Sequence, residues 1–280
     1  MGGNIVASTM TAPFARQFLP NRALIQLAGE NVLAFLNNII TADVEGLPLA
    51  QIAYGALLSP QGKIQHEMFV INNDDSILID CVRSQRDDLI RKLVMYRLRA
   101  KIEITPDDSR VIVVSPSGEG TVDPRFPALG VRALANDGDK ADDYNAFRIS
   151  LGVPDGEGDI GVNEHFPHEA NLDLLNGLSF DKGCYVGQEV VSRMQHRGTA
   201  RSRMLPVICD GPSPAKGTAI TSGEQQIGTI LSSQSSRAIA LVRLDRLAEG
   251  KAPLLSAGVR VHVHKPEWMT IDVTIPEAAR

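Results

Sequence analysis

The chain has 280 residues, a net charge of −5, 43% hydrophobic residues and 22% charged residues. This length predicts about two domains, and the composition is ordinary for a soluble globular protein. The negative net charge excludes a general electrostatic attraction to nucleic acid or to an anionic membrane. Any basic site must therefore be local.

The cysteines limit the possible compartments and metal centres. Only Cys81, Cys184 and Cys209 occur, far apart and odd in number, which argues against a disulfide framework and favours a reducing compartment. The sequences around Cys81 and Cys209 are typical of strands, so we expect both thiols to be buried and inert. Without a C-x-x-C pair, the chain cannot build a four-thiolate zinc or iron–sulfur centre by itself.

The first half of the chain alternates strand and helix patterns. Residues 22–29 alternate like a strand, and a helical stripe of apolar side chains then runs from Val32 to Ile39. A meander of three strands is predicted at residues 54–58, 64–71 and 76–82. No apolar segment is long enough to span a membrane, and residues 1–20 lack the apolar core of a signal peptide.

Turn and cap residues divide these elements. Ser59-Pro60-Gln61-Gly62 has Pro at the second and Gly at the fourth position of a tight turn. Ser84 is predicted to cap a helix whose acidic residues come early and basic residues late, as the helix dipole favours. Strands are predicted again at residues 102–104 and 111–114. Residues 155–168 are predicted to form a long loop rich in Gly, Pro and His, and a loop of this length in a compact domain more often has a function than not.

After Arg203 the sequence changes to short β segments separated by Gly and Pro, which predicts a small β-barrel or sandwich. We therefore expect one region over residues 1–203, with two interleaved subdomains, and a second domain over residues 204–280. The predicted strands of this second domain are Met204–Ile208, Gln226–Ser233, Ala238–Arg243, Val259–His264 and Met269–Val273.

The densest concentration of polar chemistry lies between Lys182 and Glu189, in the run Lys-Gly-Cys-Tyr-Val-Gly-Gln-Glu. Its two glycines free the backbone for tight turns, so the run is predicted to be a loop that enters a short helix near Gly187. Lys182 and the helix N-terminus would favour the thiolate of Cys184. A buried free cysteine on a tight turn is an equally good interpretation of the local chemistry.

This run follows Phe166-Pro167-His168-Glu169-Ala170-Asn171-Leu172 and Gly177-Leu178-Ser179-Phe180-Asp181, and together they resemble the YgfZ/IBA57 family of folate-binding proteins. That family is related in fold to the T-protein (aminomethyltransferase) of the glycine cleavage system. The resemblance extends over roughly residues 20–275. It implies an α+β fold, with two mixed α/β folate-binding subdomains and a small C-terminal β-barrel around a central channel.

The resemblance also implies a function. It implies a tetrahydrofolate-binding accessory factor for the assembly or repair of iron–sulfur enzymes, particularly [4Fe–4S] enzymes, with tRNA modification among the associated processes. Its partners would be folate, in the form of tetrahydrofolate or a one-carbon derivative, and client enzymes or cluster-assembly proteins. Neither a membrane nor nucleic acid is expected as a partner. The protein is expected to be a monomer. The implied location is the bacterial cytoplasm, or the mitochondrial matrix in a eukaryote.

Site residues follow from the resemblance and from folate chemistry. Glu169 resembles the family's pterin-facing glutamate, since one carboxylate accepts the paired N–H donors of the pterin edge. Asn171 could reach the same edge, or could simply stabilise a turn. Cys184 and Lys182 are the candidate reactive pair, for thiol exchange, a one-carbon adduct or transient iron ligation. The remaining candidate cofactor-binding residues are Tyr185, Gln188 and Glu189, with Arg193 and Arg197 from a basic cluster that could hold the anionic glutamate tail.

One departure from the T-proteins argues against aminomethyl transfer. Their Gly-Gly-x-x-Asp-Asp pattern holds the catalytic aspartate, whereas the aligned run here is Gly62-Lys63-Ile64-Gln65-His66-Glu67. Glu67 could substitute only if its side chain faces the ligand, and strand alternation places it opposite His66. A folate-dependent aminomethyltransferase is therefore the second hypothesis. A binding module that keeps the fold without using folate is the third.

Overall fold

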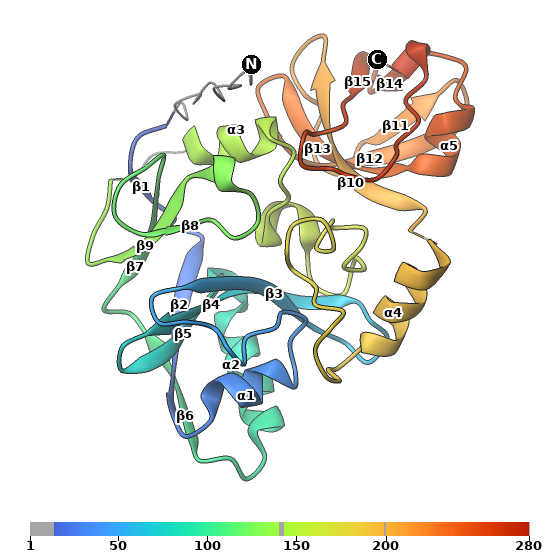
Figure 1. Ribbon diagram of the computed structural model, residues 1–280. Coiled ribbons are helices and arrows are strands. Elements are labelled where there is room, and N and C mark those ends of the chain that lie inside the picture. The colour runs from blue at the N-terminus through green and yellow to red at the C-terminus, as the bar shows by residue number, and fades with distance from the viewer. Residues whose placement is uncertain (1–13, 140–142, 199, 280) are drawn as a thin grey trace, which may run out of the picture.

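The structure is a computed structural model that describes residues 14–279, except residues 140–142 and 199. It consists of two antiparallel sheets and a closed β-barrel (Figure 1). In Figure 1 the barrel lies at the upper right and the N-terminal sheet with its helices lies below. The structure thus confirms the predicted α+β class with a C-terminal barrel.

The N-terminal sheet is buried on both faces. In sheet order, its strands are β3 (Ile52–Leu58), β4 (Ile64–Asn73), β5 (Ser76–Val82), β2 (Arg22–Gly29) and β6 (Ile102–Asp107). Helices α1 (Val32–Asn37) and α2 (Arg86–Arg97) pack on one face through apolar side chains such as Leu36 and Leu93. Every residue of β5 is buried. Burial on two faces explains why β5 is almost continuously apolar rather than alternating.

The second sheet is smaller, with β1 (Gln17–Phe18), β7 (Val111–Ser115), β9 (Val131–Ala135) and β8 (Thr121–Val122) in sheet order. It is followed by α3 (Asp143–Ser150) and by a π-helical turn, Gly156–Ile160. The central apolar core collects side chains from all parts of the molecule, including Phe69, Ile149 and Ile239. Short 3₁₀ turns occupy Arg83–Gln85, Pro127–Leu129 and Glu277–Ala279.

The barrel contains, in order around its wall, β10 (Ser202–Cys209), β13 (Arg237–Arg243), β12 (Gln225–Gln234), β11 (Ala219–Ser222), β14 (Leu254–Ser256) and β15 (Val259–Val263). Pairing of β10 with β15 closes it. Helix α5 (Leu244–Glu249) contributes Leu247 to the barrel core. Closure leaves the barrel without a free sheet edge.

Most predicted strands are confirmed, and one predicted strand is wrong. The sequence missed β1, β8, β9 and α3 before the barrel, and β11, β14 and α5 within it. Residues 269–273 form no strand, because Met269 and its apolar neighbours pack against the barrel core as an irregular segment. The missed strands have two to five residues, too few to show a clear alternation. The predicted cap at Ser84 is also wrong, because a 3₁₀ turn precedes α2 and the N-cap position is Gln85.

A buried network of charged side chains joins the two sheets. Arg22 on β2 pairs with Glu67 on β4 at 2.7 Å and with Asp80 on β5 at 2.6 Å. The second carboxylate oxygen of Asp80 accepts from Arg132 on β9, in the other sheet. These side chains are at most 3% exposed.

The network continues through Asp123, which pairs with Arg125 at 2.8 Å and with Arg132 at 3.5 Å. The guanidinium groups of Arg22, Arg125 and Arg132 lie 4.0–5.3 Å from the centre of the Phe69 ring. Three cations thus match three carboxylates around one aromatic ring. Burial alone would raise the pKa of Asp123, but Arg125 and Arg132 outweigh it and lower the pKa.

We expect Asp80→Asn to destabilise the protein strongly, because it leaves Arg132 and Arg22 buried with incomplete charge compensation. Removing one partner of a buried ion pair costs about 3–5 kcal/mol. Urea denaturation should show this as a lower midpoint. The matched control is Asp245→Asn, which removes an exposed Arg–Asp pair with Arg243 and should change the free energy of unfolding by less than about 1 kcal/mol. Equal effects of the two substitutions would contradict the structural role of the network.

Candidate functional site

The loop that carries Cys184 leads directly into helix α4 (Gln188–Arg197). Gly187 is the N-cap residue and adopts the left-handed conformation, with φ of 82°. The predicted loop-to-helix transition near Gly187 is therefore confirmed. The first turn of α4 holds Gln188, which is half-buried, and Glu189, which is exposed.

Gly187 is pressed against the tight turn between β3 and β4. A Cβ atom at this position would lie 2.7 Å from the carbonyl oxygen of Ser59. Gly62, in the same turn, faces Val190 of α4, and a Cβ on it would lie 2.8 Å from the Val190 Cβ. Close approach and positive φ both require glycine at these two positions. The turn and the motif, singled out separately in the sequence, are therefore one packed unit.

The other end of the loop is held by Lys182. Its Nζ donates to the carbonyl oxygens of Asn37, Ile40 and Ala42 at 2.5, 2.7 and 2.6 Å. These carbonyls lie at the end of α1 and just after it, where a cation is favoured. Burial lowers the pKa of Lys182 to about 8. This clamp could not be predicted from local sequence patterns, because its acceptors lie 140–145 residues earlier in the chain.

Thr41 is a further residue of the site that sequence reasoning missed. Its hydroxyl donates to the Gly177 carbonyl at 2.6 Å and accepts from the Ala56 amide at 2.9 Å. Its own carbonyl accepts from the Ser179 amide at 2.9 Å. Thr41 thus ties the segment before the motif to β3. The signal that could have found it is a threonine directly after the helical stripe that ends at Ile39, where a hydroxyl can bond to neighbouring backbone groups.

The Cys184 thiol is exposed, whereas Cys81 and Cys209 are buried. Burial raises the pKa of Cys81 to about 12 and also raises the pKa of Cys209, as expected for inert strand thiols. The interpretation of Cys184 as a buried core cysteine does not apply. Its loop is fixed at Lys182 and at Gly187, so the exposed thiol stands on a short segment anchored at both ends.

Tyr185 belongs to the same segment, but its side chain is buried. The residue is 7% exposed, and the centre of its ring is 5.1 Å from the Lys182 Nζ, a cation–π contact. Its hydroxyl is buried and has no hydrogen-bond partner among the described residues. Burial raises the pKa of Tyr185 to about 12. A buried hydroxyl that lacks a partner is unusual and points to a water or a ligand atom beside it.

Glu169 lies in the neighbouring loop, and its side chain is 20% exposed. One carboxylate oxygen accepts from the Phe166 amide at 2.9 Å and lies 3.9 Å from Nδ1 of His165. Among the described residues, Nε2 of His165 and Nδ1 of His168 have no hydrogen-bond partner, although the Glu164 carboxylate lies 3.9 Å from Nε2 of His165. Burial lowers the pKa of both histidines. The other ring nitrogen of His168 contacts Gln195 on α4 at 3.0 Å, which connects this loop to the motif helix.

Asn171 is engaged by the fold. It has a φ of 59°, its amide donates to the Met204 carbonyl at 2.7 Å, and its amide oxygen accepts from Arg203 at 3.4 Å. Arg203 in turn forms a bidentate salt bridge with the Asp173 carboxylate, with N···O distances of 2.6 and 2.9 Å. Of the two interpretations of Asn171, this geometry favours the turn-stabilising one.

The predicted basic cluster is only partly available. Arg193 pairs with Glu189 across one turn of α4 at 2.5 Å, and both side chains are exposed. The side chain of Arg197 lies outside the described part of the chain. His196 and Arg201 are exposed. Arg203, as above, is buried and paired.

Strand alternation placed His66 and Glu67 on opposite faces of β4, and this is confirmed. His66 contacts Asp88 of α2 at 3.0 Å, while Glu67 points into the molecule toward Arg22. Glu67 is 2% exposed, and its second carboxylate oxygen has no partner within the protein. Burial raises the pKa of Glu67, against the opposing effect of Arg22.

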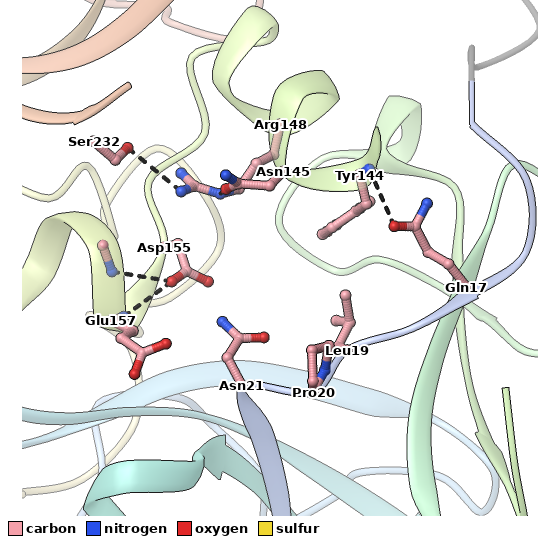
Figure 2. A pocket seen from close by; sticks show the side chains of 11 residues that line it. Gln17, Leu19, Pro20, Asn21, Tyr144, Asn145, Arg148, Asp155, Glu157 and Ser232 are labelled. Carbon is pink, nitrogen blue, oxygen red and sulfur yellow. Dashed lines mark hydrogen bonds between the residues drawn. The ribbon is translucent and has the colours of Figure 1, made fainter. Parts of the chain in front are cut away.

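A cavity of about 320 Å³ lies where α3, the π-helical turn, the segment before β2 and barrel strand β12 meet (Figure 2). Asp155 and Asn21 extend into it from two sides, and Tyr144 and Arg148 form part of its wall. Burial would raise the pKa of Asp155, but Arg148 and Arg22 outweigh it and lower the pKa to about 2. None of the site residues predicted from the sequence lines this cavity.

Within the part of the chain that the structure describes, no three His, Cys, Asp or Glu side chains are grouped so as to hold a metal ion. Within the same residues, no helix is both long and apolar enough to cross a membrane.

Comparison with known proteins identifies relatives over nearly the whole chain. The mitochondrial iron–sulfur cluster assembly factor IBA57 of Mus musculus is 28% identical, over 91% of this chain and 82% of its own length. The Homo sapiens protein of the same name is also 28% identical, over 95% and 88%. The Neurospora crassa homologue is 30% identical, over 70% of this chain and 54% of its own length.

Two further comparisons concern the fold. A family described as the C-terminal β-barrel domain of CAF17 matches residues 201–271. The crystal structure of glycine cleavage system aminomethyltransferase T from Bartonella henselae superimposes with a TM-score of 0.73, over 93% of this chain and 87% of that one, at 13% identity. The chain is therefore a homologue of the proteins named iron–sulfur cluster assembly factor IBA57, with the fold of the glycine cleavage T-protein and a CAF17-type C-terminal barrel.

Proposed function

We propose that this protein is an accessory factor for the assembly or repair of iron–sulfur enzymes, particularly [4Fe–4S] enzymes, and that it acts through Cys184. The observation that carries the proposal is the placement of this thiol. It is exposed, and the loop around it is anchored by the Lys182 clamp and by the Gly187 contact. Relatives bearing the name of iron–sulfur cluster assembly factors support the same function.

An accessory role follows from the ligand count. Among the described residues, Cys184 is the exposed thiol and has no cluster of metal-ligating side chains beside it. An iron–sulfur cluster needs more thiolate ligands than one loop cysteine supplies. A cluster handled at this site is therefore cargo whose other ligands come from a partner, either a client enzyme or a cluster-assembly protein.

We further propose that the protein binds tetrahydrofolate or a one-carbon derivative through the loops around Glu169 and Tyr185. The residues fit such a ligand in two respects. Among the residues that the structure describes, one carboxylate oxygen of Glu169 is left for the N–H donors of a pterin edge, and buried polar atoms of His165, His168 and Tyr185 have no hydrogen-bond partner. Folate, when bound, would supply one-carbon chemistry, while these residues would bind and orient it.

The residues at the start of α4 would contact the outer part of the proposed folate ligand. Gln188 and Glu189 stand on the first turn of α4, with Arg193 one turn later. Arg193 and Arg197 would hold an anionic glutamate tail, for which Arg193 must exchange its exposed partner Glu189. Such an exchange costs little, because exposed ion pairs contribute at most about 1 kcal/mol.

A folate-dependent aminomethyltransferase is the second candidate, favoured by the shared fold and by the inward-facing Glu67. Glu67 is, however, bound to Arg22 and beneath Gly156, where a Cβ would lie 2.6 Å from its carboxylate oxygen. A base held in this way is poorly placed to meet a substrate. Turnover of aminomethylated carriers or methylated amines by the purified protein would favour this candidate over the accessory role.

We also propose that residues 1–203 form the folate-binding region and residues 204–280 the barrel domain, and that the protein works as a monomer. It would act in the cytoplasm of a bacterium or in the mitochondrial matrix of a eukaryote, in line with relatives that are named mitochondrial.

Cys184 should be the one rapidly alkylated thiol of the folded protein, because Cys81 and Cys209 are buried. Mass spectrometry after brief iodoacetamide treatment should show one adduct, and Cys184→Ala should show none. In cells that lack the protein, Cys184→Ala should fold with an unchanged Tm but fail to restore [4Fe–4S] enzyme activity. Full restoration by this variant would overturn the proposed role of the thiol.

Lys182 should make stability depend on pH in a predictable direction. Its pKa is lowered from 10.5 to about 8, so folding below pH 8 must bury an ammonium, and this cost disappears as pH rises from about 8 to 10.5. The free energy of unfolding of the wild type, relative to Lys182→Met, should therefore increase over that range. Urea titrations across the range measure this difference. The exposed Lys251→Met should show no such trend, and a flat difference for Lys182→Met would contradict the buried clamp.

Glu169→Gln should weaken tetrahydrofolate binding by about tenfold or more, since hydrogen bonds to a charged group are worth about 1.5–3 kcal/mol. Anaerobic calorimetric titration measures the effect. Glu249→Gln is the control, because that carboxylate is exposed on α5 of the barrel, and this substitution should leave affinity unchanged. Wild-type protein that binds no tetrahydrofolate would instead favour a module that keeps the fold without its ligand.

A further inference from the structure

The end of α2 carries apolar side chains that the fold does not use. Leu89 and Leu93 bury one side of the helix against the N-terminal sheet. Val94, Met95 and Leu98 point elsewhere and are 42%, 62% and 85% exposed. Their spacing of one, three and four residues puts them on one patch of the helix surface.

Leu98 is also held in a conformation that does not suit it. It occupies the C-cap position of α2 with φ of 51° and ψ of −108°, a region that glycine adopts freely and other residues adopt at a cost. A leucine here pays that strain and gains almost no burial in return. Folding therefore does not explain the choice of residue, and a role outside the folded chain does.

The sequence around this apolar patch is rich in cations. Residues 89–102 contain Arg91, Lys92, Arg97, Arg99 and Lys101 and no acidic residue, in a chain whose net charge is −5, and the exposed Glu103 follows them. Arg91 and Lys92 share Asp88, and Arg97 donates to the Ile102 carbonyl. Arg99 and Lys101 are exposed, and no salt bridge joins either to a carboxylate in the described part of the chain.

We propose that this tip of α2, formed by Val94, Met95, Leu98, Arg99 and Lys101, docks on an anionic phospholipid surface. Protruding apolar side chains ringed by cations are the combination that binds peripherally to anionic bilayers. The tip lies at the bottom of Figure 1, at the opposite end of the molecule from the barrel. The overall negative charge hides this local site.

A bilayer suits the tip better than an acidic protein does. A specific protein interface needs roughly 800 Å² and about 20–30 residues on each partner, whereas this patch consists of a few convex side chains. A fluid bilayer needs no complementary shape, and a few cations with inserted apolar side chains suffice for weak, reversible binding. Helix α4, which the Cys184 loop enters, would stay free, because it lies on another side of the molecule from the tip of α2 in Figure 1.

Flotation of the full-length protein with vesicles tests the proposal. Vesicles of equal parts phosphatidylcholine and phosphatidylglycerol should bind it and release it at high salt, and vesicles of phosphatidylcholine alone should not bind it. Arg99→Ala with Lys101→Ala should reduce partition by about thirtyfold, from about 1 kcal/mol per cation. Lys251→Ala with Lys265→Ala, two exposed lysines of the C-terminal domain, is the charge-matched control and should bind normally.

Leu98→Gly tests the apolar part without endangering the fold. It removes both the strain and the exposed side chain, so its Tm should be unchanged or higher while vesicle binding falls. The proposal is overturned if the wild type does not bind anionic vesicles, or if the tip variants bind as the wild type does. Binding to soluble polyglutamate without binding to vesicles would also overturn it, in favour of an acidic protein partner.

Discussion

The ion network around Phe69 is the constraint on which the arrangement of the two sheets depends. Asp80 receives Arg22 from its own sheet and Arg132 from the other, so one buried carboxylate fixes their mutual orientation. Such a network contributes less to net stability than apolar packing of the same volume would. It contributes specificity instead, because a shifted sheet would leave buried charges without partners. The same contacts turn Glu67 inward and bind its carboxylate to Arg22.

Secondary structure and the motif loop were largely predictable, because the signals are local. Gly62 and Gly187 predicted their turns, and continuous apolar runs predicted the central strands. What local patterns do not contain is the destination of a side chain. From its place in the motif, Lys182 was expected to stabilise the Cys184 thiolate. In the structure its ammonium instead donates to three carbonyls 140–145 residues earlier in the chain. Asn171 likewise matched a motif, and only the structure shows that both ends of its amide are occupied.

The candidate site combines a rigid frame with an open centre. Backbone contacts at Gly187 and Thr41 leave little freedom to the segment between residues 177 and 187. In the described part of the chain, buried polar atoms of Tyr185, His165 and His168 have no hydrogen-bond partner. A rigid loop beside polar atoms without hydrogen bonds is suited to binding a ligand, since preorganisation lowers the entropic cost of holding it.

The Lys182 clamp also sets an order of events in folding. Its acceptors belong to α1 and the residues just after it, which leave the ribosome long before the motif does. The thiol loop can take its final form only after the N-terminal sheet and α1 have assembled, so a cysteine made late is shaped by residues made early. Conversely, local unfolding of α1 alone would free the loop at its Lys182 end. Substitutions in this short helix, remote in sequence from any cysteine, would thus behave genetically as lesions of the thiol site.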